Sequence, residues 1–156
     1  MIVVDANVLA FYLIQGEQTA NAIQARERDA EWVVPPLWRA EFQSILWKYV
    51  RHGGLPEMTA LDLLDKAMEL LGPSVREPAA DGVLRDALRW NITVYDAQYI
   101  TLARQMGVRC VTEDRPLQKA CPEIAISLKD FISGTQGDGR VREGKTDYRV
   151  RVKRKV

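Results

Sequence analysis

The sequence predicts an α/β protein, a three-layer α/β/α sandwich built on a mostly parallel sheet. Short apolar segments rich in Val and Ile alternate with longer segments of helical periodicity, which is the pattern of strands joined by helical crossovers. The chain has 156 residues, the usual size of a single domain. Its 47% apolar and 28% charged residues, with a formal net charge of +1, are typical of a globular protein.

The first third of the chain gives two strands and three helices. Residues 2–5 form an apolar strand that ends in an acid, and residues 6–15 and 19–30 are compatible with helices. A second brief strand at 32–34 stops at a pair of prolines. From residue 37, apolar side chains recur every three or four positions, which predicts an amphipathic helix closed by a Gly-Gly pair.

The alternation continues to about residue 132. A capping-box-like start at Thr59 opens a helix that ends before Pro73, and Pro78 opens another that runs to about Trp90. The segments that follow are a break at 91–95, a helix ending at Gly107, a strand at 108–112, a short helix at 115–120, a strand at 124–126 and a final helix at 127–132.

The composition changes after Ser133, which divides the chain into a body at residues 1–133 and a basic tail at residues 134–156. The tail contains four glycines, eight basic residues and three acidic residues, and large apolar residues are scarce in it. The body carries 14 basic and 18 acidic residues. The near-neutral chain therefore consists of an acidic body and a basic appendage.

The rare residues exclude several kinds of site. Two cysteines, Cys110 and Cys121, and one histidine, His52, supply at most three ligands, one fewer than a closed zinc site needs. His52 lies at a predicted helix end, and no nucleophile elbow is near it. We therefore expect carboxylates to carry the chemistry of any active site.

The sequence also argues against a membrane protein. Its longest apolar run has seven residues, from Val8 to Ile14, whereas a membrane-spanning helix needs about 20. The first residues contain no basic segment of the kind that opens a secretory signal. We expect no membrane association and a cytoplasmic location.

Four acidic residues stand where predicted strands end. Asp5 ends the first strand, Glu41 lies in the first turns of the helix after the second strand, Asp96 opens the helix after the break, and Asp114 follows the third strand. An open parallel sheet binds its ligands outside this end, so we expect all four to face one rim. Their wide spacing means that only the fold can bring them together.

Each acid also has an ordinary explanation. Asp96 and Asp114 stand near predicted helix starts, where they could act as N-caps or dipole partners, and Glu41 could be a solvated helix residue. Asp5 is harder to explain in this way, because an acid that ends a buried strand is costly to bury without a partner. The four together favour a shared site.

Carboxylates that meet in one pocket would repel each other, and a cation would relieve that repulsion. A donor set made of oxygens favours Mg²⁺ or Mn²⁺, which keep several waters and accept substrate phosphates. This chemistry predicts the hydrolysis of phosphodiester bonds, in which one or two metal ions orient an attacking water and stabilise the leaving oxygen.

Four segments resemble the ordered motifs of PIN-domain nucleases, especially the VapC-type toxins of prokaryotic toxin–antitoxin pairs. They are residues 3–9, 35–42, 95–100 and 111–117. The resemblance covers about residues 1–133 and rests on four motifs in order rather than on any one of them. It implies a PIN-like fold with about five parallel strands, of which the pattern along this chain identifies four.

The resemblance implies an endoribonuclease that depends on Mg²⁺ or Mn²⁺ and acts on single-stranded or looped RNA. It also implies a homodimer that a cognate antitoxin protein inhibits. By motif match, the four acids at the strand ends would be the metal ligands and catalytic residues. Asn7 and Thr112 would orient these ligands or a bound water through hydrogen bonds, although a turn and a strand end explain the two residues equally well.

Basic residues are candidates for binding the substrate. Arg115 could steady a phosphate in the transition state, or it could be a surface arginine at a helix start. In the tail, Arg149, Arg151 and Lys153 could contact RNA phosphates. The tail could equally be a solvated extension, a partner contact or, through its alternation of Arg and Val, an edge strand in a dimer.

The sequence thus predicts a metal-dependent ribonuclease that serves as the toxin of a toxin–antitoxin pair. Two other functions fit the same residues: a catalytically silent PIN-fold module that binds RNA or a protein, and a PIN nuclease with a role in RNA processing. The RNA target stays open, because a pocket of carboxylates encodes little information about bases.

Overall fold

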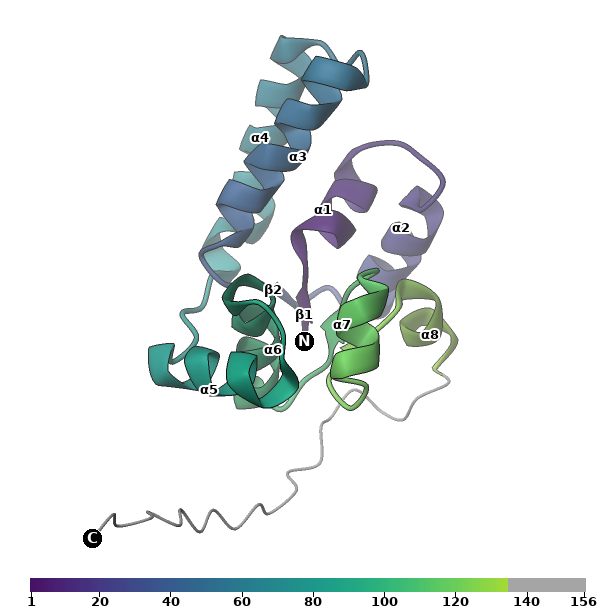
Figure 1. Cartoon of the computed structure of the whole chain (residues 1–156). Coiled ribbons are helices and arrows are strands. Elements are labelled where there is room, and N and C mark those ends of the chain that lie inside the picture. Colours follow the sequence, from purple (N-terminus) through teal and green to yellow (C-terminus); the bar gives the residue numbers. More distant parts are fainter. Residues whose placement is uncertain (135–156) are drawn as a thin grey trace, which may run out of the picture.

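Four short parallel strands form a sheet within residues 1–134, the part of the chain that the computed structural model describes. Their order across the sheet is β2 (Trp32–Val33), β1 (Ile2–Val4), β3 (Cys110–Val111) and β4 (Ala125–Ile126), and each neighbouring pair is parallel (Figure 1). Every residue of these strands is buried, as expected for a parallel sheet covered on both faces.

The fifth strand that the resemblance implied is reduced to a single bridge. Val75 pairs in parallel with Val34, just beyond the end of β2. The N–H of Val34 donates to the carbonyl of Ser74 (3.4 Å), and the N–H of Arg76 donates to the carbonyl of Val34 (2.9 Å). Prolines flank this segment on both sides, and because proline has no backbone donor, the pairing does not extend into a full strand.

Helices cover both faces of the sheet. The helices α1 (Ala6–Leu13) and α2 (Thr19–Arg28) connect β1 to β2, and α8 (Leu128–Ser133) packs on α2. The return to β3 places α6 (Val94–Met106) against β1 and β3, with α5 (Ala80–Trp90) packed on it. The crossover from β1 to β2 and the crossover from β2 to β3 run in opposite directions across the sheet. Because such crossovers are right-handed, their helices lie on opposite faces of the sheet and form the two outer layers. The predicted three-layer α/β/α architecture is confirmed.

The helices α3 (Trp38–His52) and α4 (Glu57–Leu71) form a hairpin that projects from the sheet (Figure 1). The turn η1 (Gly72–Ser74) follows α4. The helix α4 begins two residues before the predicted start, with Pro56 at its N-cap in the extended conformation that this position usually takes. Thr59 therefore lies inside the first turn, and the predicted capping box is wrong.

Large aromatic side chains fix the base of the hairpin in the core. Trp32, Trp38 and Phe42 are fully buried, and the rings of Trp38 and Phe42 lie 6.3 Å apart on one face of α3. This packing holds the first turns of α3, which carry Glu41, in the core beside α1. Within residues 1–134, no helix has both the length and the apolar character needed to cross a membrane.

An ion pair with a buried carboxylate joins α5 to α6. Asp86 is 3% exposed and accepts hydrogen bonds from Oγ1 of Thr101 (2.8 Å) and from Nε of Arg104 (2.9 Å). Removal of its carboxylate would leave a buried hydroxyl and a partly buried guanidinium without their partner.

We expect Asp86→Ala to lower the free energy of unfolding by about 2 kcal/mol, less than for a fully buried pair because Arg104 is partly exposed. Urea denaturation measures this difference. The control is Asp81→Ala, which removes an exposed pair with Arg85 and should change the free energy of unfolding by less than about 0.5 kcal/mol. Equal losses in the two variants would contradict the role given to Asp86.

Candidate functional site

The carboxyl end of β1 is the point at which the strand order reverses. From β1 the chain crosses to β2 on one side, and it later returns to β3 on the other side. Helices that leave in opposite directions part at such a point, and open α/β sheets bind ligands in the resulting crevice. A pocket of about 240 Å³ opens at this position.

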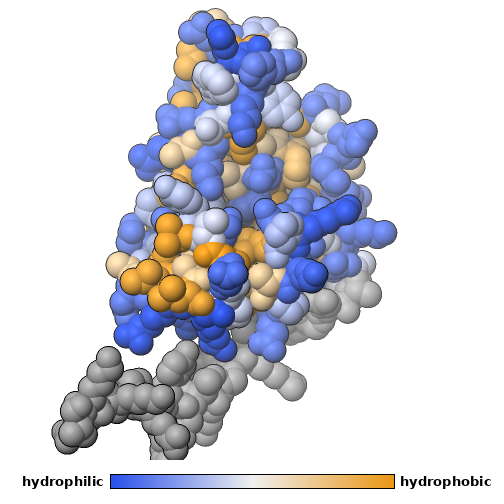
Figure 2. All heavy atoms as spheres, viewed as in Figure 1, coloured by the Kyte–Doolittle hydropathy of each residue, from blue (hydrophilic) through white to orange (hydrophobic). Residues whose placement is uncertain are grey.

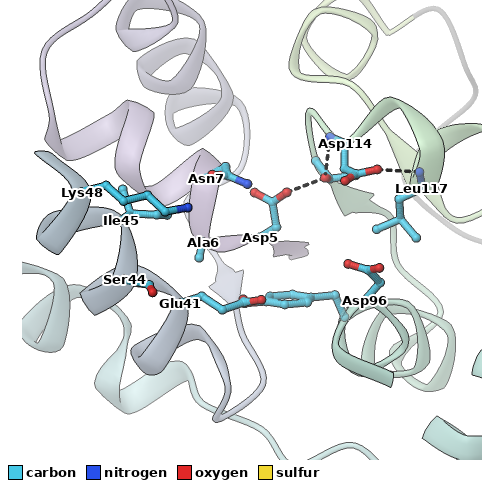
Figure 3. A pocket seen from close by; sticks show the side chains of 12 residues that line it. Asp5, Ala6, Asn7, Glu41, Ser44, Ile45, Lys48, Asp96, Asp114 and Leu117 are labelled. Atoms are coloured by element: carbon cyan, nitrogen blue, oxygen red, sulfur yellow. Dashed lines mark hydrogen bonds between the residues drawn. The ribbon is translucent and has the colours of Figure 1, made fainter. Parts of the chain in front are cut away.

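All four acids predicted from the sequence line this pocket (Figure 3). Asp5 comes from the end of β1, Glu41 from the first turn of α3, Asp96 from the first turn of α6, and Asp114 from the start of α7, a helix of residues Arg115–Ala120. The fold therefore brings together acidic side chains that lie far apart in the sequence.

Asp5 is the most deeply buried of the four. It is the N-cap of α1, and its Oδ1 accepts a hydrogen bond from the N–H of Val8 (2.8 Å) while its Oδ2 accepts one from the hydroxyl of Thr112. Burial raises the pKa of Asp5 to about 6, although both hydrogen bonds lower it, and the nearby charge of Glu41 raises it further. Ionised Asp5 is therefore held in the pocket at an electrostatic cost.

Thr112 links Asp5 to Asp114. Its hydroxyl donates to Asp5 and accepts a hydrogen bond from the N–H of Asp114 (3.0 Å). Asp114 is in turn the N-cap of α7, and its Oδ1 accepts a hydrogen bond from the N–H of Leu117 (2.7 Å). The turn after β3 is therefore fixed relative to the end of β1.

Glu41 is held by a residue that the sequence analysis did not identify. The hydroxyl of Tyr99 donates to Oε2 of Glu41, and Tyr99 is 3% exposed. Burial raises the pKa of Tyr99, as does the neighbouring charge of Glu41, so the hydroxyl stays protonated and acts as a donor. Burial also raises the pKa of Glu41, the hydrogen bond from Tyr99 lowers it, and the charge of Asp96 raises it. These carboxylates are thus close enough to influence one another.

Asp96 is positioned by the cap of α6. The hydroxyl of Thr93 accepts a hydrogen bond from the N–H of Asp96 (3.1 Å) and donates to its Oδ2 (2.7 Å). This cap starts α6 at Val94, inside the segment predicted to be a break. Tyr99 follows Asp96 by three positions, so the two side chains leave neighbouring parts of one helix face. The spacing of three residues from Asp96 could have indicated from the sequence that Tyr99 lies near the site.

A second wall of the pocket comes from α3. Ser44 and Lys48 line the pocket and follow Glu41 by three and seven positions, which places all three on one helix face. Asn7 lines the pocket beside Asp5 (Figure 3). The helical spacing from Glu41 is the signal by which Ser44 and Lys48 could have been found.

Of the predicted substrate-binding residues, only Arg115 lies in the part of the chain that the structure describes. Arg115 is exposed at the first position of α7 and lies outside the set of described residues that line it. Arg149, Arg151 and Lys153 belong to residues 135–156, outside the described part of the chain.

The donor set of the pocket fits a hard divalent cation. Its acidic ligands all present oxygens, and a cation would offset the cost of burying ionised Asp5. The four carboxylates surround the pocket without converging on one point, since no group of three or more His, Cys, Asp or Glu side chains in residues 1–134 is arranged to hold an ion. Because Mg²⁺ usually keeps several waters and takes one or two carboxylates directly, a hydrated ion matches this spacing.

Comparisons with known proteins agree with this architecture. The sequence profile described as PIN domain matches residues 2–121. The chain is 32% identical to Ribonuclease VapC3 of Pyrobaculum aerophilum over 127 residues, which cover 79% of this chain and 96% of that protein. It is 35% identical to Exonuclease VapC9 of the same organism over 77 residues, 49% of this chain and 57% of that protein. The crystal structure of PAE2754 from Pyrobaculum aerophilum superimposes with a TM-score of 0.67 at 26% identity, covering 86% of this chain and 97% of that one.

The raised pKa of Asp5 predicts a pH-dependent stability in the absence of metal ions. The folded carboxyl titrates near pH 6 and the unfolded one near its ordinary value of 3.8, so the folded state binds more protons between these values. The stabilisation from protonated Asp5 is complete at low pH and is lost as the pH rises through about 6. Asp5→Asn cannot ionise, so its free energy of unfolding should not fall in this way. We expect the difference in free energy of unfolding between Asp5→Asn and the unmodified protein to increase by about 1.5 kcal/mol from about pH 5 to about pH 7.5.

Urea denaturation in EDTA at both pH values measures this gain. The matched control is Asp62→Asn on the exposed side of α4, which should follow the unmodified protein at each pH. If the free energy of unfolding of Asp5→Asn changes with pH as that of the unmodified protein does, the carboxyl of Asp5 does not carry the burial cost assigned to it.

Proposed function

This chain belongs to the PIN-domain family, and from that premise we propose that it is a metal-dependent endoribonuclease and the toxin of a toxin–antitoxin pair. The observation that carries the proposal is the meeting of four carboxylates from separate elements in one pocket at the switch point of the sheet. The similarity to a named ribonuclease over 96% of its length supports RNA as the substrate.

We assign a Mg²⁺ or Mn²⁺ ion to the four acids, directly or through water. When bound, the ion would supply a Lewis acid that activates water and offsets the charge that develops on the phosphodiester. The protein's own contribution is to hold its carboxylates in place. Thr112 orients Asp5, Tyr99 orients Glu41 and Thr93 orients Asp96, each through a hydrogen bond from a hydroxyl. The fourth acid, Asp114, is held by the N–H of Leu117. Asn7 stands beside Asp5 and is assigned to water or to the substrate.

The proposal includes protein partners, namely an antitoxin and a second copy of this chain, and a cytoplasmic location. Figure 2 shows apolar side chains gathered over α5 and α6. The exposed large apolar residues of these helices are Leu84, Leu88, Val94 and Tyr95. Leu84 and Leu88 are four positions apart on one face of α5, and such a stripe can pack against its own copy about a two-fold axis. An exposed patch of this kind supports the homodimer.

Cleavage assays test the proposed activity. We expect the purified chain to cut single-stranded or stem-loop RNA in Mg²⁺ or Mn²⁺, to lose this activity in EDTA, and to lose it by more than about 100-fold in Asp96→Asn. Asp62→Asn should retain full activity. RNA labelled at either end separates internal cleavage from exonuclease action, because internal cleavage shortens both labelled products at once. Cleavage that persists in EDTA or in Asp96→Asn would refute the proposal.

Tyr99→Phe tests the support given to Glu41. The substitution removes only the hydroxyl, so we expect unchanged melting temperature but roughly tenfold weaker Mn²⁺ binding by calorimetry, because Glu41 loses its donor. Tyr12→Phe is the matched control, since the ring of Tyr12 packs on Trp32 away from the pocket, and its Mn²⁺ affinity should not change. Equal affinities in the two variants would show that Tyr99 serves packing alone.

A further inference from the structure

The pocket has two walls of different chemistry. One wall carries Asp5, Asp96 and Asp114, whereas the wall from α3 carries Ser44 and Lys48 beyond Glu41. Among the described residues that line this pocket, Lys48 is the one cationic side chain. Figure 3 shows its amine reaching from α3 toward Asn7 at the rim of the carboxylates.

Lys48 is not occupied in neutralising the acids. The ion pairs within residues 1–134 do not include it, and its side chain is exposed. The same face of α3 continues with Arg51 and His52, three and four positions further, and both are exposed. Basic and polar side chains therefore run from the pocket along the hairpin.

A second hollow adjoins the pocket on the side opposite to this wall. Its volume is about 260 Å³, and Asn91, Ile92 and Thr93 contribute to its lining. Asp96 and Asp114 line both hollows. Asp96 and Asp114 thus stand between two openings, which is the arrangement expected if an extended chain passes over them from one opening to the other.

A nucleic acid that crosses these acids brings several negative charges into a negatively charged crevice. A divalent ion can compensate the phosphate above the carboxylates, but the neighbouring phosphates need cations of the protein itself. Building on the proposed function, we infer that Lys48 binds a backbone phosphate of single-stranded RNA on the α3 side of the carboxylates, with the hydroxyl of Ser44 beside it. The strand then leaves the pocket along α3 toward Arg51.

The alternative role for Lys48 is to stand in for the metal ion. An ammonium that served this purpose would compete with the ion, so its removal would strengthen metal binding and leave the contacts to RNA unchanged. A phosphate contact has the opposite signature. Its loss weakens RNA binding, reduces the salt dependence of binding and leaves metal affinity unchanged.

The experiment compares Lys48→Met, which keeps the length of the side chain and removes its charge, with Lys48→Arg, which keeps the charge. Lys66→Met is the matched control, because Lys66 is an exposed lysine inside α4 that does not line the pocket. Binding of a labelled single-stranded RNA is followed by fluorescence anisotropy over a range of salt concentrations. All proteins in this assay also carry Asp96→Asn, so that the RNA stays intact. Mn²⁺ affinity is measured by calorimetry without this second change.

We expect Lys48→Met to weaken RNA binding about tenfold and to reduce the slope of log affinity against log salt by about 0.7, the value for one phosphate contact on a single strand. Lys48→Arg should restore the slope, Lys66→Met should not alter it, and Mn²⁺ affinity should stay the same in all three. An unchanged slope in Lys48→Met, or tighter Mn²⁺ binding, overturns the inference.

Failure of the proposed function gives a different result. If the unmodified chain does not cleave RNA with any metal ion, the activity is refuted while the anisotropy slopes still report whether Lys48 contacts phosphate. If cleavage is normal and the slope for Lys48→Met is unchanged, the activity stands and the assignment of Lys48 falls.

Discussion

The burial of Asp5 at the carboxyl end of β1 is the constraint on which the rest of the site depends. A carboxylate can remain there only if donors reach it, and the N–H of Val8 and the hydroxyl of Thr112 provide them. Because Thr112 also receives the N–H of Asp114, the same contact fixes the turn after β3. The hydrogen bonds that offset one buried charge thereby set the positions of two acids. The remaining cost, visible in the pKa of about 6, is the part that a bound cation would remove.

Helix capping and the shared pocket are not competing explanations of these acids. Asp5 and Asp114 are N-caps, and Asp96 exchanges hydrogen bonds with the cap residue Thr93, yet all three line one pocket. A cap binds one edge of a carboxylate and leaves other lone pairs available. It also restricts the side chain to one rotamer, which is what a preorganised ligand requires. Helix starts at the carboxyl ends of parallel strands therefore bring structural and chemical roles to the same residues.

The features that the sequence predicted are those set by local patterns. Buried strands, the amphipathic α3 and acids placed just after strands can be identified from short stretches, and the switch point follows from the order of elements. Other features depend on contacts between elements. That Tyr99 meets Glu41, and that Lys48 turns toward the pocket, depends on how α6 and α3 are rotated against the sheet, which periodicity does not specify. The single bridge at Val75 could not be predicted from the sequence, because the alternating pattern that indicates a strand needs several residues.

The distribution of charge links the binding of ion and substrate. The body of the chain carries four more acidic than basic residues, and its pocket is lined by carboxylates, so a polyanion approaching the metal-free protein meets repulsion. A divalent ion in the pocket would offset part of the negative charge of the four carboxylates and could contact a phosphate directly. The phosphate would in turn add to the negative charge that holds the ion. Each ligand then raises the affinity for the other by the same factor, since the coupling free energy is reciprocal. In the proposed arrangement Lys48 has a separate role, because it would bind the part of the strand that lies beyond the reach of the ion. The contribution of Lys48 to RNA binding would therefore not depend on whether the carboxylates hold an ion.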